Sequence, residues 1–348
     1  MSEQRLLFMR LSALGDVILT LPALAYAREN YPDVKRTYLT RSPYASLLTQ
    51  LDPALELLRY PEDIDTRATL WRWLERHPVA GVIDLHAGLR TRFWLWGLAT
   101  RRAIPVVHVD SEPLLRRRHL KRWPWCWFPA PTQEALPVRQ RVLETTQRAL
   151  QCWLKSSPSS DTPVQTQHQK NGNVEYRLSP LGFRIALLPG AHHATKAWPI
   201  RHWQTLGQQL EAEGLEVIWL GSVQELSLLH ACSWGQARAL TLAGDLPTLW
   251  PQIASCQLAV GNDSGLTHLA ELLNVPVVMI RGPTVGAFGF SPHLPASQVV
   301  ELPLSCRPCS LHGAAACPLT HRACLETLDP SDVYSRVLSF LQRRTSHG

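Results

Sequence analysis

The sequence predicts an α/β protein of two doubly wound domains that face each other across a cleft. Short apolar runs alternate with helix-patterned segments along the 348-residue chain, which is typical of parallel sheets covered by helices. The alternation stops in a polar stretch rich in Ser, Gln, Asn and Pro, and then restarts, which indicates a linker. The predicted boundaries are a first domain at 1–155, a linker at 156–181, a second domain at 182–328 and a C-terminal helix at 329–348.

The first half begins with a strand, a turn that contains glycine, and a helix. Apolar runs predict strands at 5–11, 36–40, 81–86 and 106–109, and helical spacing predicts helices at 17–28, 44–51, 70–76, 92–100 and 134–154. In the first turn, Gly15 lets the backbone approach a ligand. Asp16 stands where the turn meets the helix, either as a cap or as a functional carboxylate. The pattern G-x-G-x-x-G is missing, so a dinucleotide-dependent dehydrogenase is not supported.

The second half repeats the alternation. Strands are predicted at 184–188, 215–220, 256–260 and 275–280, with a further segment at 239–243, and helices at 200–213, 246–254, 266–273 and 330–341. Pro199 occupies a permitted first-turn position of one helix, and Gly214 is its stop signal.

The stretch Val260–His268 is the centre of the predicted site. A buried strand that stops at Gly-Asn-Asp-Ser-Gly and turns straight into a helix offers free backbone N–H groups to an anion such as phosphate. The same residues add the carboxylate of Asp263, the hydroxyl of Ser264 and the imidazole of His268. The alternative is an ordinary helix cap with a surface histidine.

Polar residues follow the strands of both halves. In the second half they are Lys196, Glu225, Asp263, Ser264, Gly265 and Thr284. A lysine and helix N-terminal amides suit a pyrophosphate, and a glutamate at a strand end suits a ribose diol. Without a Walker A motif, phosphoryl transfer from ATP is not expected. In the first half Asp16, His86, Arg90 and Arg92 follow strands. We expect the second half to bind a nucleotide-diphospho donor and the first half to bind an anionic acceptor that bears a hydroxyl. These two substrates are those of a glycosyltransferase, in which a carboxylate acts as the base.

The excess positive charge lies in the first half. Residues 1–150 carry 22 Lys and Arg against 15 Asp and Glu, whereas residues 151–348 carry 13 of each. The basic run 116–122 is followed by Trp123, Trp125 and Trp127, and cations beside aromatics suit a membrane surface and a lipid-linked anionic partner. The alternatives are nucleic acid or a solvated face. No apolar run spans a membrane, and no signal peptide is evident, so a cytoplasmic location is expected, with peripheral contact at the inner membrane.

Four of the eight cysteines cluster as Cys306, Cys309, Cys317 and Cys324. The first pair has the spacing of metal ligands, but the later gaps match no standard zinc pattern. Buried thiols in a compact loop are the preferred interpretation, with zinc as the alternative and no metal expected in the reaction.

Three ordered motifs resemble one family. Leu11–Leu24, Gly190 with Thr195–Pro199, and Gly261–His268 together resemble the bacterial lipopolysaccharide heptosyltransferases, glycosyltransferase family nine. The resemblance implies the GT-B architecture of two Rossmann-like domains and inverting, metal-independent transfer from ADP-L-glycero-D-manno-heptose, which is a co-substrate rather than a cofactor. The acceptor would be Kdo–lipid A or its heptosylated inner core, with no nucleic-acid partner.

The resemblance also implies roles for single residues. Asp16 would be the general base, Lys196 a catalytic contact to donor phosphate and sugar, Glu225 the ribose ligand and Asp263 the ligand of heptose hydroxyls. The donor contacts would be completed by Thr195, Ser264, Gly265, Leu266 and His268. The expected acceptor contacts are Ser12, Gly15, His86, Arg90, Arg92, Arg116 and Lys121. The alternatives are a GT-B transferase for another nucleotide sugar, or a non-catalytic protein that binds anionic lipid or nucleic acid.

Overall fold

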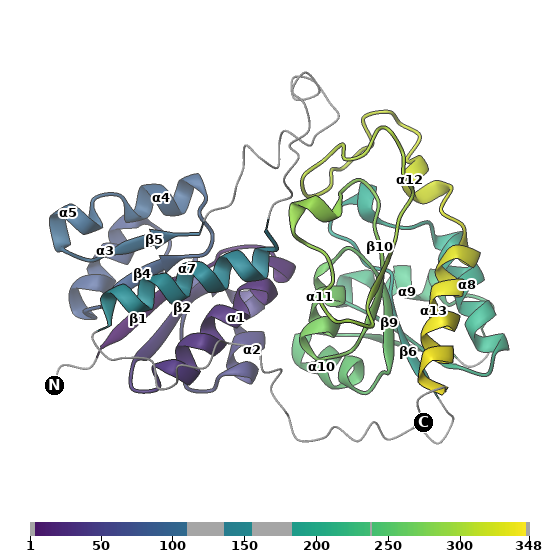
Figure 1. Ribbon diagram of the computed structural model, residues 1–348, viewed down its shortest axis with the longest axis horizontal. Coiled ribbons are helices and arrows are strands. Elements are labelled where there is room, and N and C mark those ends of the chain that lie inside the picture. Colours follow the sequence, from purple (N-terminus) through teal and green to yellow (C-terminus); the bar gives the residue numbers. More distant parts are fainter. Residues whose placement is uncertain (1–3, 110–135, 155–182, 237–238, 346–348) are drawn as a thin grey trace. The chain divides into compact units, whose positions relative to one another are not determined.

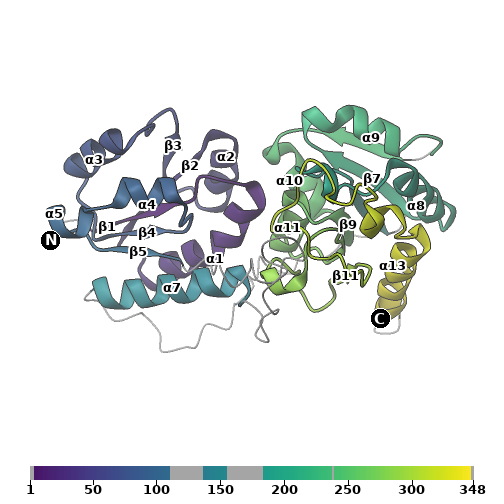
Figure 2. The ribbon, with the colours of Figure 1, turned by 90° about the horizontal axis from the view of Figure 1, so that it is seen from above.

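The computed structural model describes residues 4–109, 136–154, 183–236 and 239–345. These form an N-terminal unit of 4–109 with 136–154, and a C-terminal unit of the remaining described residues. In each unit a parallel sheet carries helices on both faces (Figures 1 and 2). The predicted α/β class with two parallel sheets is therefore confirmed, whereas the predicted linker lies outside the described residues.

The N-terminal sheet has the strand order β3-β2-β1-β4-β5. All four pairings are parallel. The strands are β1 (Arg5–Met9), β2 (Lys35–Arg41), β3 (Glu56–Tyr60), β4 (Gly81–Asp84) and β5 (Val106–His108). The helices are α1 (Leu14–Asn30), α2 (Ser42–Leu51), α3 (Arg67–Arg76), α4 (Leu89–Leu95), α5 (Leu98–Arg102) and α7 (Val138–Trp153).

Alternation along β1 explains the two helical layers. Leu7 and Met9 join one buried cluster with residues of α3, α4 and α5. Side chains of a strand alternate between the faces of its sheet, so Phe8 points to the other face. There it stacks on Tyr38, whose hydroxyl meets Thr20 of α1 at 2.7 Å. The fully buried residues of β1 thus hold helices on both sides.

The C-terminal sheet has the order β11-β10-β9-β6-β7-β8, again parallel throughout. The strands are β6 (Arg184–Leu188), β7 (Glu216–Gly221), β8 (Leu240–Ala243), β9 (Leu258–Asn262), β10 (Val277–Ile280) and β11 (Gln298–Val300). The helices are α8 (Ile200–Ala212), α9 (Leu226–Cys232), α10 (Leu246–Ala254), α11 (Gly265–Leu272), α12 (Ala323–Glu326) and α13 (Pro330–Thr345).

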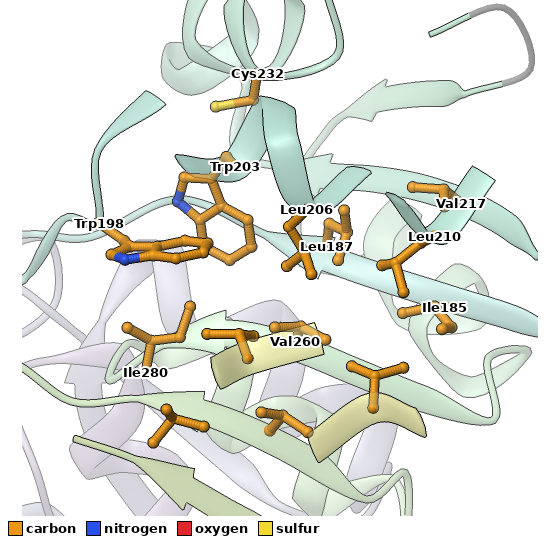
Figure 3. Packing of buried hydrophobic residues seen from close by; sticks show 14 of the residues in the cluster. Ile185, Leu187, Trp198, Trp203, Leu206, Leu210, Val217, Cys232, Val260 and Ile280 are labelled. Atoms are coloured by element: carbon orange, nitrogen blue, oxygen red, sulfur yellow. The ribbon is translucent and has the colours of Figure 1, made fainter. Parts of the chain in front are cut away.

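A tryptophan-rich core fills one face of this sheet (Figure 3). Trp203 of α8 is fully buried between the indoles of Trp198 and Trp219, with ring centroids 5.1 and 6.1 Å apart. Side chains of α9 and α13 complete the cluster. Helices α10 and α11 lie on the other face (Figure 1). No helix within the described ranges has the length and apolarity needed to cross a membrane.

Several predicted boundaries are wrong. The helix expected at 92–100 is two helices, because the chain turns at Gly97 with a positive φ of 85°. The first helix begins at Leu14 rather than residue 17, so Asp16 lies in its first turn. The strand expected at 256–260 runs instead from Leu258 to Asn262. Strands β3 and β11 were not predicted. Both strands are short and lie at a sheet edge. In β3 the charged Glu56 and Arg59 interrupt the apolar pattern, and β11 has only three residues, so neither forms a long apolar run.

Candidate functional site

Asp263 is the centre of a polar group at the carboxyl ends of three strands in the C-terminal unit. Its Oδ2 lies 2.8 Å from Nζ of Lys196, which follows β6. The same oxygen accepts a hydrogen bond of 3.0 Å from the Thr284 hydroxyl, which follows β10. Oδ1 lies 3.6 Å from Nε2 of His268, one turn into α11. Parallel strands end at the same edge of a sheet, so residues from 196 to 284 meet there.

The Asp263 carboxylate remains ionised despite its burial. Only 6% of its side chain is exposed. Burial alone would raise its pKa, but the Lys196 ammonium and the His268 ring outweigh that effect and hold the pKa well below its usual range. The site therefore holds a buried anion paired with the Lys196 cation, and such pairs are common at functional sites.

Asn262 fixes the loop that carries Lys196. It is fully buried, and its amide nitrogen donates to the Pro189 carbonyl at 2.7 Å. Its amide oxygen accepts from the backbone N–H of Trp198 at 3.2 Å. One side chain thus holds both ends of the 189–198 loop against β9. Its place directly before Asp-Ser at a strand end was the available sequence signal, but no role was predicted for it.

Ser264 is the N-cap of α11, and its side chain makes no capping hydrogen bond. The first backbone N–H groups of a helix have no partner within that helix. The amides of Gly265 and Leu266 lie in this first turn, beside Asp263 in the sequence. Such a helix N-terminus offers backbone N–H groups and the positive end of the helix dipole to an anion.

Glu225 lies where β6 and β7 end. Its Oε2 accepts hydrogen bonds of 2.8 Å from both the N–H and the hydroxyl of Ser222. A Cβ on Gly190 would lie 2.1 Å from its Oε1, so the lack of a side chain at Gly190 leaves room for the carboxylate in this position. The carboxylate is thereby held against the loop that leads to Lys196.

Thr195 is engaged with a distant loop. Its hydroxyl donates to the Ala314 carbonyl at 2.9 Å and accepts from the Ala314 N–H at 2.8 Å. Its own N–H donates to the same carbonyl at 3.2 Å. These bonds attach the loop of the clustered cysteines to the residue before Lys196. The predicted donor contact of Thr195 remains a prediction.

Arg307 was not predicted to belong to the site, because nothing in its local sequence marks it. It is buried, and its guanidinium donates to the carbonyl oxygens of Gly282 and Leu302, and to that of Thr284 at 2.8 Å. It also pairs with Glu301 at 2.6 Å. Arg307 thus supports the segment 282–284, whose threonine contacts Asp263.

The four cysteines beside Arg307 are free thiols. Burial raises the pKa of Cys324 to about 11, Arg307 opposes the shift, and the other three cysteines add to it. Across 4–109, 136–154, 183–236 and 239–345, no three His, Cys, Asp or Glu side chains form a group that could hold a metal ion.

In the N-terminal unit, Asp16 lies in the first turn of α1. Its carboxylate pairs with Arg10 and accepts from the Ala13 N–H at 3.4 Å. Arg10 also donates to the carbonyls of Ser12 at 2.7 Å and Leu85 at 2.6 Å. Arg10 therefore fixes Asp16 relative to the ends of β1 and β4. Ser12 and Gly15 belong to this same turn.

His86 follows β4 and lies near Asp16. Its Nδ1 is buried and has no hydrogen-bond partner among the described residues. Burial lowers its pKa and the Arg10 charge adds to this, whereas Asp84 and Asp16 act in the opposite direction. Ala87 next to it has a φ of 48°, in the left-handed region that non-glycine residues rarely adopt. A neutral imidazole with an unsatisfied nitrogen is therefore held beside the carboxylate.

The buried Asp84 organises the β4 end. Its Oδ1 accepts from the N–H groups of His86 and Ala87 at 3.1 and 3.0 Å. Its Oδ2 accepts from Thr91 at 2.9 Å and meets Nδ1 of His108 at 2.7 Å. Neither Asp84 nor His108 was predicted as a site residue, because their pairing depends on β4 and β5 being neighbours.

Of the four basic residues that were predicted to contact the acceptor, two lie in the described part of the chain. Arg90 donates to the Tyr60 hydroxyl at 2.6 Å, and Arg92 donates to the Ala87 carbonyl at 3.3 Å. Both are exposed and near the His86 loop. Arg116 and Lys121 lie outside the described residues.

Comparison with known proteins gives a consistent result. A family model described as glycosyltransferase family 9 (heptosyltransferase) matches residues 145–316. Lipopolysaccharide heptosyltransferase 1 of Pseudomonas aeruginosa is 27% identical over 314 residues, which is 82% of each chain. Lipopolysaccharide heptosyltransferase 2 of Escherichia coli is 34% identical over 118 residues, 32% of this chain and 34% of that protein.

Solved structures show the same architecture. E. coli heptosyltransferase WaaC with ADP aligns with a TM-score of 0.66 at 19% identity, covering 97% of this chain and all of that one. E. coli ADP-heptose LPS heptosyltransferase II aligns with a TM-score of 0.68 at 21% identity, covering 98% of this chain and all of that one. The predicted GT-B fold class is confirmed by these likenesses.

Proposed function

We propose that the chain is a heptosyltransferase of glycosyltransferase family 9, and that it transfers heptose from ADP-L-glycero-D-manno-heptose to the Kdo–heptose inner core of lipopolysaccharide, with inversion. The observation that carries the proposal is the Lys196–Asp263 pair beside the free N-terminus of α11. A cation, helix amides and a carboxylate together suit a sugar that is linked to a diphosphate.

The donor binds the C-terminal unit. The backbone N–H groups of Ser264, Gly265 and Leu266 at the start of α11 receive the diphosphate, with Lys196 as the counter-charge. An ammonium has three N–H donors and a carboxylate about four acceptor sites, so the pairing of Lys196 with Asp263 leaves capacity on both. Asp263 then accepts from heptose hydroxyls, and Glu225 from the ribose diol. The relatives support the choice of ADP, since the solved WaaC is named as a complex with ADP.

The acceptor binds the N-terminal unit. The acceptor hydroxyl gives its proton to Asp16 as its oxygen bonds to the anomeric carbon of heptose. The bond from that carbon to the diphosphate breaks on the opposite face, and ADP leaves with the electron pair. Lys196 and the helix dipole stabilise the charge that develops on ADP. No cofactor takes part in this scheme.

His86, Arg90 and Arg92 recognise the acid groups of the acceptor. The unsatisfied Nδ1 of His86 supports this assignment, because a buried polar atom without a partner costs free energy until a ligand supplies one. Ser12 and Gly15 would line the same turn. An acceptor of this kind is anchored in lipid, so peripheral contact with the cytoplasmic face of the inner membrane is part of the proposal.

The test is ADP release from ADP-heptose by the purified protein, with and without Kdo–lipid A. Acceptor-dependent release supports both substrates. If ADP-heptose binds without turnover, a longer core acceptor is tried next. If ADP-heptose does not bind, while UDP or another nucleotide competes for the site, the donor assignment is wrong and a transferase of another nucleotide sugar replaces it.

A further inference from the structure

Helix α4 is apolar on two opposite faces. Its inner face is packed in the core through the buried Trp94 and Leu95. Its outer face consists of Leu89, Phe93 and the adjoining Trp96, which are 90%, 60% and 65% exposed. Their spacing of four and three residues places them on one side of the helix. We call these three residues the α4 face. An exposed cluster of large apolar residues is a sign of an interaction site.

Arginines surround the α4 face. The Arg67 guanidinium lies over the rings of Phe93 and Trp96, 5.3 and 5.6 Å from their centroids, and donates to the Trp96 carbonyl at 2.7 Å. The Arg101 guanidinium also lies over the Trp96 ring, 5.7 Å from its centroid. The rings are thereby held in place, with cations beside them.

The chain segment that contains this face carries a positive net charge. Residues 65–102 contain seven arginines and three acidic residues, a net charge of +4. Of the three acids, Asp84 is fully buried and Glu75 pairs with Arg102. The remaining one, Asp65, accepts a hydrogen bond from Thr69 at 2.9 Å. The local field therefore favours an anionic partner.

We propose that the α4 face docks on the surface of an anionic lipid bilayer. Tryptophan, phenylalanine and leucine enter the headgroup boundary while arginines meet lipid phosphates. A second copy of the chain fits less well, because a symmetric contact would bring the same arginines of two copies together. Nucleic acid would gain nothing from the exposed Leu89.

Docking here would bring the predicted acceptor residues to the membrane. Leu89 directly follows the His86–Gly88 loop, and Arg90 lies on the same short helix. The inference extends the proposed function, since a lipid-anchored acceptor reaches the enzyme at a membrane. It does not depend on turnover, because the assay below contains no acceptor.

The experiment is sedimentation of the full chain with vesicles of phosphatidylcholine, with or without phosphatidylglycerol. The wild type should bind the anionic vesicles, and added salt should weaken this binding. The double variant Phe93→Ser/Trp96→Ser should bind at least about tenfold more weakly, because it loses two aromatic side chains that the bilayer would bury on docking. Leu89→Ser, at the most exposed position, gives a second variant with little risk of unfolding. Trp234→Ser is the matched control, since Trp234 is 77% exposed in the C-terminal unit.

Equal binding by the wild type and both α4 variants would overturn the proposal. So would a concentration-dependent dimer that is lost in the same variants, which would assign the face to a second copy. Turnover with a de-O-acylated, soluble acceptor tests the proposed function separately from the docking proposal. The α4 variants should retain it whatever the vesicle result, whereas failure of the wild type in that assay would count against the proposed function alone.

Discussion

The Lys196 ammonium and the Asp263 carboxylate form a contact of 2.8 Å in which both side chains are largely buried. Removing one partner leaves an uncompensated buried charge, whereas removing both does not. The pair thus links the stability of the C-terminal unit to the group that we assign to the donor.

A double-mutant cycle should reveal this coupling. Lys196→Met alone should destabilise the protein more than Lys196→Met combined with Asp263→Asn, with an interaction free energy of about 0.5–3 kcal/mol. Urea unfolding of the four proteins measures it. Additive losses would show that the two charges are independent. Each single variant should also bind ADP more weakly than the wild type.

The low pKa of Asp263 should make folding stability depend on acid pH. The unfolded aspartate titrates near about 3.9, and the folded one lies below it. The stabilisation is complete above the unfolded pKa. As pH falls below it, the unfolded chain takes up a proton that the folded protein does not, and stability is lost. Urea unfolding from pH 6 to pH 3 should show a shallower fall in Asp263→Asn than in the wild type. Asp33→Asn, at an exposed position, should keep the wild-type slope.

Asp16→Asn should lower turnover by about 10²–10⁴-fold, the usual effect of losing a general base. Donor affinity should be unchanged, because Asp16 belongs to the other unit. Calorimetry with ADP measures the affinity and ADP release measures turnover. Arg10→Met should cause a smaller loss through misplacement of Asp16, with partial recovery in Arg10→Lys. Full turnover in Asp16→Asn would remove the base from the mechanism.

Arg307→Met should destabilise the C-terminal unit by about 3 kcal/mol or more, since several buried acceptors lose their donor. The loss of support for Thr284 should also weaken donor binding. Arg343→Met is a suitable control and should keep the wild-type melting temperature, because Arg343 is an exposed arginine of α13 that donates to the Ser339 carbonyl at 3.1 Å. A wild-type melting temperature in Arg307→Met would show that the network is dispensable.

Chelation should leave turnover unchanged, and elemental analysis should find no stoichiometric metal. The reason is that the mechanism uses Lys196 and helix amides, rather than a cation, against the diphosphate. One equivalent of zinc or iron per chain, lost in Cys306→Ser/Cys309→Ser, would establish a metal in the cysteine loop instead.

The sequence predicted best those site residues that directly follow a strand. Strand ends predict that Lys196, Asp263 and Thr284 share one edge, and the structure brings them into contact. Arg10 and Arg307 were missed because their partners, such as Leu85 and Gly282, lie 75 and 25 residues away. Strand β3 was missed because Glu56 and Arg59 interrupt its apolar pattern. Glu56 is explained by partners on β1 and β2, because it forms an ion pair with Arg5 and accepts from the Thr37 hydroxyl at 3.3 Å.

The reciprocal bonds between Thr195 and Ala314 have a dynamic consequence. They join two loops that are 119 residues apart in the sequence. Local opening in proteins occurs in cooperative units, and neither loop can separate from the other without breaking these bonds. We therefore expect a substitution in the cysteine loop to change how often the loop that carries Lys196 opens.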